Sequence, residues 1–305
     1  AIVEAAASTL GAERIPRITV DLAEESAHHE GIAASARIRM GLVGQRTWRL
    51  AHVLAHESTH VLENQESDLH LGEHGSTMRF FIEGSAEWVA FEVCQDEALG
   101  LTSADERLEE RELRVVSRIV AAASAERHHV RFEHLLDDAT FRARLDTALA
   151  YPLGETLTEA IARGCGDAAV GGLARAFARG EAPQNATGEA LLRDGLAAAA
   201  CDLERVLGAW DSLLAETLAA ERARVDAIPR MHGGLVSAPP MGLVIEAVLD
   251  RAPLPVETYS LRFRSDERTD DVEVRGVPGE IVPGSSPRRV RFTIPRDGAP
   301  AGARF

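Results

Sequence analysis

The stretch from Thr47 to Glu63 reads TWRLAHVLAHESTHVLE. Its apolar residues recur at the three- and four-residue spacing that places side chains on one face of a helix. They are Leu50, Val53, Leu54, Val61 and Leu62. The periodicity predicts a helix over residues 47–63, and within it stands the pattern H-E-x-x-H, from His56 to His60.

This pattern predicts a metal site. Histidines four residues apart lie on the same helix face, so the imidazoles of His56 and His60 can bind one Zn²⁺. Glu57, beside the first histidine, projects toward the position of a metal-bound water, which suits it to act as general base. His52 stands four residues before His56. It is a candidate for supporting the ligands or substituting for one, or it is a helix histidine satisfied elsewhere.

A second stretch, FFIEGSAEWVAF at residues 80–91, carries two acids four residues apart in an otherwise apolar segment. It predicts a helix over residues 79–95. Burying carboxylates without partners is costly, so Glu83 and Glu87 should be paired, protonated or bound to metal. A catalytic zinc takes three protein ligands and keeps one position open, and Glu83 is the candidate third ligand. For Glu87, an ordinary salt bridge remains the alternative.

The combination of H-E-x-x-H with a later E-G-x-A-E resembles the gluzincin metallopeptidases, especially the peptidase MA-like and aminopeptidase N-like branches. The resemblance implies a thermolysin-like zincin catalytic domain. It also implies that His56, His60 and Glu83 bind Zn²⁺, that Glu57 is the general base, and that Glu87 orients a histidine.

The segment AYPLG at residues 150–154, followed by a helix and Gly164, is similar to a Y-x-x-G-helix-G segment of the same group. There the tyrosine donates a hydrogen bond to the oxyanion, so the resemblance gives this role to Tyr151. A tyrosine beside a proline at a helix start is otherwise a packing residue.

The chain also departs from related patterns. No G-x-M-E-N stretch precedes the zinc helix, so the acidic anchor of true aminopeptidases is missing, and exopeptidase specificity is left open. The metzincin pattern requires a glycine and a histidine where Glu63 and Glu66 stand, so it is excluded.

The predicted fold class is α+β. An active-site subdomain is expected over residues 1–100, a helical subdomain over 101–230 and a small all-β module over 240–305, with a linker around 229–240. Strands are predicted at 17–22 and 36–40, and in the module at 243–249, 259–263, 272–274 and 290–294. Helix breaks are predicted at 151–152, 164–166, 180–183 and 195.

Composition limits the partners. The 305 residues carry a net charge of −15, all of it in residues 1–239, so nucleic acid is an unfavourable partner. No apolar run reaches the length of a membrane span.

The chain has no lysine, which excludes Schiff-base chemistry. Its three widely spaced cysteines predict buried thiols. Residue 1 is Ala, as a truncated or processed N-terminus would leave, so no compartment is predicted.

In the module, Arg262, Arg264, Arg289 and Arg291 are predicted to share one sheet face, which is either solvated or a docking surface for an acidic partner. The sequence thus predicts a zinc-dependent metallopeptidase acting on peptides or proteins. Two alternatives stay open, namely a catalytically inactive scaffold or binding protein, and a zinc hydrolase of a non-peptide amide.

Overall fold

The computed structural model describes residues 1–23, 31–34, 36–41, 47–67, 75–136, 147–179, 188–228, 231–237, 242–249, 260–261, 277–285 and 289–295. Most of these residues are helical, and the described strands form small sheets, in agreement with the α+β class. The chain divides into two compact units, residues 1–221 and 222–305.

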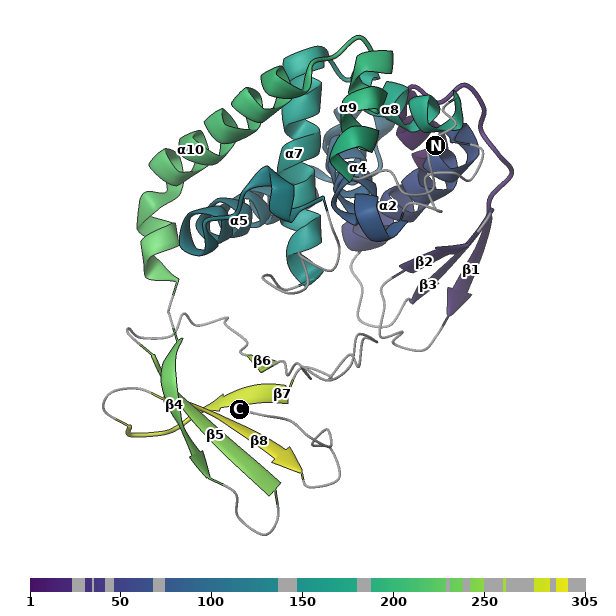
Figure 1. The fold of residues 1–305 in the computed structure, drawn as a ribbon. Helices are drawn as coiled ribbons and strands as arrows, with labels where there is room; N and C mark the ends of the chain where they lie inside the picture. The colour runs from purple at the N-terminus through teal and green to yellow at the C-terminus, as the bar shows by residue number, and fades with distance from the viewer. Residues whose placement is uncertain are drawn as a thin grey trace. The chain divides into compact units, whose positions relative to one another are not determined.

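Helices build most of the first unit (Figure 1). They are α1 (Ile2–Leu10), α2 (Thr47–Glu66), α4 (Gly75–Gln95), α5 (Ala104–His128), α7 (Ala150–Cys165), α8 (Ala168–Arg179), α9 (Gly188–Ala198) and most of α10 (Leu203–Ala227), with short 3-10 turns η1 (Glu97–Leu99), η2 (Phe132–His134) and η3 (Thr147–Leu149). The predicted helices over 47–63 and 79–95 are confirmed, and α2 and α4 extend a few residues beyond them. α4 packs against both α2 and α7.

The main core lies between these helices and includes the fully buried side chains of Phe80, Phe81, Leu153 and Leu157. The helix break predicted at 151–152 agrees with the start of α7, because Pro152 falls in the first turn, where its missing N–H costs no helix bond. The predicted break at Gly195 is wrong, since α9 continues to Ala198.

A small sheet lies beside α2 in the first unit (Figure 1). Its order is β1 (Thr19–Ala23), β3 (Arg37–Gly41), β2 (Gly31–Ala34), with β1 parallel and β2 antiparallel to β3. Ile38 and Met40 of β3 alternate inward and pack with Val53 and Val61 of α2 in a small apolar cluster. The strands predicted at 17–22 and 36–40 are confirmed within a residue or two.

The described strands of the second unit form a sheet in the order β4, β5, β8, β7, β6. Their bounds are β4 (Met231–Ser237), β5 (Gly242–Leu249), β6 (Ser260–Leu261), β7 (Val277–Ile281) and β8 (Arg289–Pro295). The strand predictions for 243–249 and 290–294 are confirmed, the one for 259–263 in part, and residues 272–274 lie outside the described residues. The linker prediction is wrong for Met231–Ser237, because this segment pairs with β5 across an irregularity near Gly234.

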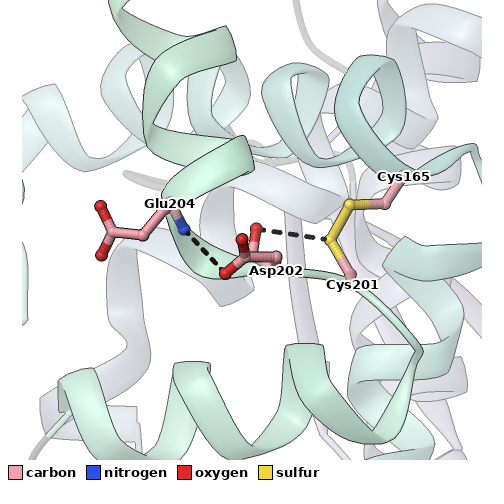
Figure 2. The surroundings of a disulfide bond; sticks show 4 residues. All are labelled: Cys165, Cys201, Asp202 and Glu204. Carbon is pink, nitrogen blue, oxygen red and sulfur yellow. Dashed lines mark hydrogen bonds between the residues drawn. A yellow bond between two sulfur atoms is a disulfide. The ribbon is translucent and has the colours of Figure 1, made fainter.

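The prediction of three buried thiols is wrong for two cysteines. Cys165, the last residue of α7, forms a disulfide with Cys201, which lies just before α10 (Figure 2). Cys94 in α4 is a free, buried thiol. None of the helices in the described part of the chain combines the length and apolar character of a membrane span.

Candidate metal centre

Two histidines of α2 point toward a common position. Four residues correspond to slightly more than one helical turn, so His56 and His60 lie one above the other on the same helix face. Their Nε2 atoms are 3.1 Å apart, and their rings stand nearly perpendicular, with an interplanar angle of 89°. The two lone-pair positions therefore converge.

Glu83 of α4 completes the group. Its Oε2 lies 3.5 Å from Nε2 of His56 and 3.6 Å from Nε2 of His60. A tetrahedral zinc with ligands at about 2.0–2.1 Å separates its ligand atoms by about 3.3–3.4 Å. The spacing of the three donors matches this value, so they could hold a metal ion. The third predicted ligand thus lies with the first two.

The charges of this group favour a cation between the three side chains. Burial by itself lowers the pKa of His56, but the contacts with the carboxylates of Glu83 and Glu87 raise it to about 9. Burial acts to raise the pKa of Glu83, yet its contacts with His56 and His60 hold that pKa well below its usual range. The carboxylate of Glu83 therefore stays ionised at any physiological pH and attracts positive charge.

The predicted catalytic residues flank these donors. Glu57 follows His56 on α2 and is 8% exposed. The ring of Tyr151, at the start of α7, stacks on that of His56 with centroids 5.9 Å apart and an interplanar angle of 26°. Burial and the negative charge of Glu83 raise the pKa of the Tyr151 phenol. Its hydroxyl therefore remains a hydrogen-bond donor.

Glu87 lies one turn after Glu83 and contacts two histidines. Its Oε2 is 2.6 Å from Nε2 of His52 and 3.6 Å from Nδ1 of His56. Although burial raises the pKa of Glu87, the positive charge of His52 and its hydrogen bond hold that pKa well below the ordinary value. The shorter contact is with His52, so the two residues predicted to support the ligands contact each other directly.

Two buried acids of this region, Glu63 and Glu110, were missed by sequence reasoning. Glu63, one turn after His60, accepts a hydrogen bond from the hydroxyl of Ser85. Glu110 of α5 accepts from Nδ1 of His52. The position of Glu63, three residues after His60, could have suggested a role. Glu110 stands in the charged run EREL of an amphipathic helix, and only the fold shows that it is buried.

A separate hollow of about 450 Å³ is lined by α1, α4 and the start of α8, including Trp88, Glu92 and Asp167. None of the metal-donor residues lines it. For this reason the hollow is not the candidate site.

Comparison with known proteins adds no assignment. Models of known protein families do not match the chain, and a search of curated proteins found no significant similarity.

Proposed function

We propose that this chain is a zinc-dependent metallopeptidase of gluzincin type, in which His56, His60 and Glu83 bind Zn²⁺. The observation that carries the proposal is the mutual spacing of their three donor atoms, 3.1, 3.5 and 3.6 Å. Two imidazoles and one carboxylate are also the ligand set that hydrolytic zinc sites use, with a fourth position open to substrate. The resemblance of the motifs to gluzincins supports the same assignment.

The reaction would divide among four side chains. When bound, zinc supplies Lewis acidity toward the attacking water and the scissile carbonyl. Glu57 accepts the proton of the water and delivers it to the leaving amine. The hydroxyl of Tyr151 donates a hydrogen bond to the developing oxyanion. The carboxylate of Glu87, 3.6 Å from Nδ1 of His56, favours a proton on Nδ1, which would keep Nε2 free to bind metal.

The finer architecture belongs to the same proposal. A thermolysin-like zincin would comprise an active-site subdomain over residues 1–100 and a helical subdomain over 101–230. Residues 240–305 would be an all-β module. Within it, Arg289 and Arg291 both bind Glu246, so part of the predicted basic face is already neutralised. Docking of an acidic partner there would depend on the remaining arginines.

The first experiment is metal analysis of the purified protein, wild type beside His60→Ala and Glu83→Ala. We expect both substitutions to lower the zinc bound per chain by one, because each removes a donor from the same centre. Glu112→Gln, an exposed change on α5, is the matched control and should leave the zinc content unchanged. Unchanged zinc in His60→Ala and Glu83→Ala would contradict the proposed ligands.

The second experiment tests catalysis with a library of quenched fluorescent peptides. Glu57→Gln should abolish cleavage while sparing zinc, since it removes the base but no ligand. Cleavage that survives in Glu57→Gln would rule out the mechanism. A chain lacking residues 240–305 should still cleave peptides if the protein is an enzyme. Zinc binding without turnover in any form would favour the scaffold, and turnover of non-peptide amides alone would favour the third alternative.

A further inference from the structure

A second group of potential metal donors lies behind the first. His52 of α2, Cys94 of α4 and Glu110 of α5 each offer one ligand atom, and these atoms all lie within 4.8 Å of one another. The exposed fractions of the three residues are 2%, 0% and 0%. Three helices therefore bring an imidazole, a thiol and a carboxylate into one buried position.

One carboxylate oxygen of this group has no hydrogen-bond partner among the described residues. Nδ1 of His52 donates to Oε1 of Glu110, and Nε2 of His52 lies 2.6 Å from Oε2 of Glu87. Oε2 of Glu110 is buried and has no hydrogen-bond partner among the described residues. A buried carboxylate oxygen without a partner is unfavourable, because it has lost its hydration without replacement. This oxygen is available to a cation.

The donor set selects the class of cation. Thiolate and imidazole favour borderline-soft transition ions such as Zn²⁺ over Mg²⁺ and Ca²⁺, which prefer oxygen ligands. Cys, His and carboxylate side chains all bind zinc, and a closed site is typical of structural zinc, whereas catalytic zinc keeps a position open to solvent. The unpartnered oxygen of Glu110 can serve as the fourth donor.

We propose that His52, Cys94 and Glu110 form a second metal site that binds Zn²⁺ or a chemically similar divalent ion and braces α2, α4 and α5. Binding displaces the thiol proton of Cys94 and the proton on Nδ1 of His52, and both protons go to solvent. His52 then binds through Nδ1 and donates its Nε2 proton to Glu87.

The arrangement also connects the two metal positions. Glu87 accepts from Nε2 of His52 at 2.6 Å and lies 3.6 Å from Nδ1 of His56, a ligand of the proposed catalytic centre. One carboxylate thus supports a histidine from each site, which is the usual outer partner of a metal-bound imidazole. Occupation of the closed site would hold Glu87 in the orientation that the first centre needs.

The test uses the full-length protein, stripped with a chelator and titrated with Co²⁺ and, separately, Zn²⁺. We expect two ions per chain in the wild type and a thiolate-to-cobalt charge-transfer absorption in the near ultraviolet. Cys94 is the free cysteine of the chain, the other two being disulfide-bonded, so this absorption reports the second site alone.

The variants separate the two sites. Cys94→Ser should bind one ion and lose the thiolate absorption, whereas His60→Ala should bind one ion and keep it. His128→Ala, at the exposed end of α5, is the matched control and should bind two. If Cys94→Ser does not fold, as judged by circular dichroism, Glu110→Gln replaces it and should also lose one ion.

The absence of a thiolate absorption in cobalt-saturated wild type would overturn the proposal, as would two ions retained in Cys94→Ser. These results are distinguishable from failure of the proposed function. A protein that keeps the absorption but shows no metal loss in His60→Ala and no peptide cleavage would have the second site without the catalytic one.

Discussion

At the scale of single residues, the candidate centre depends on side chains whose ionisation is set by their neighbours. Glu83 and Glu87 are held ionised by histidines, while Tyr151 is held protonated by burial and by the charge of Glu83. Ionised carboxylates and a protonated phenol therefore lie close together. This is the pattern expected where a cation, a base and a hydrogen-bond donor act on one substrate.

The role of Tyr151 can be tested with Tyr151→Phe, which keeps the ring that stacks on His56 and removes only the hydroxyl. Loss of one oxyanion donor should lower kcat by about 100-fold or more and leave KM and zinc content nearly unchanged. Steady-state kinetics with a cleaved peptide measures both constants. An unchanged kcat would assign Tyr151 to packing.

Glu63 gives a prediction about pH. Burial raises its pKa from 4.5 to about 8, against the hydrogen bond from Ser85, which lowers it. Between these values the folded protein holds a proton that the unfolded chain releases. The free energy of unfolding should therefore fall as the pH rises through this range, by up to about 1.4 kcal/mol per pH unit.

Glu63→Gln should remove the contribution of Glu63 to this dependence, because the amide is neutral at every pH and its carbonyl still accepts from Ser85. The contribution of His56, whose pKa is also raised, should remain. The measurement is urea unfolding with a chelator present, at intervals between about pH 5 and pH 8. Glu112→Gln serves as the control for an exposed site. Parallel pH profiles for wild type and Glu63→Gln would show that Glu63 is ionised in the folded state.

At the scale of elements, the close crossing of α4 and α7 positions Tyr151 against the proposed zinc ligands. A Cβ on Gly154 would lie 1.9 Å from the carbonyl oxygen of Phe80, and one on Gly84 would lie 2.1 Å from the carbonyl carbon of Gly154. The two helices touch through their backbones, so only glycine fits at either position. This contact determines how near Tyr151 comes to Glu83.

Gly154→Ala should push α7 away from α4. We expect the free energy of unfolding to fall by about 3 kcal/mol or more, and peptide cleavage to fall with it as Tyr151 moves. Gly164→Ala on the same helix is the matched control, since its Cβ would meet no atom closer than 3.8 Å, and alanine should be neutral or slightly stabilising there. Chemical unfolding of both variants measures the difference, and equal stabilities would refute the steric argument.

At the scale of the whole molecule, the residues proposed for both metal sites belong to the first compact unit, residues 1–221. That unit is also closed covalently by the Cys165–Cys201 disulfide, which ties the end of α7 to the start of α10. Figure 2 shows the disulfide beside Asp202, whose carboxylate accepts from the backbone N–H of Glu204 in the first turn of α10. α7, which carries Tyr151 in its first turn, is thus anchored at its far end.

Replacing both cysteines by serine should destabilise the first unit by about 3–4 kcal/mol, the loop-closure contribution for their sequence separation of 36. Denaturant titration of the double variant against wild type measures this value. Zinc at the proposed centre should be retained below the unfolding transition, because no ligand is changed. A loss of metal before unfolding would mean that the disulfide also positions α7 locally.

Local patterns were sufficient to predict the main elements of the first unit and the membership of the candidate centre. The helices that carry His56, His60 and Glu83 were predicted because side chains three and four residues apart share a helix face in any context. The strands around Ile38 and Phe292 were predicted because strict alternation has a similarly local cause. The linker prediction for residues 231–237 was wrong, because a glycine-rich segment becomes a strand only when a partner strand is present.

What the amino-acid sequence determined by itself is therefore the set of helices and the chemistry carried on each face. The tertiary structure alone decided which faces meet. The Cys165–Cys201 disulfide, the burial of Glu110 against His52 across 58 residues, and the backbone contact of Gly84 with Gly154 all join segments that are distant in the chain. Such contacts leave no periodic signal, because their energy arises only once the helices have packed.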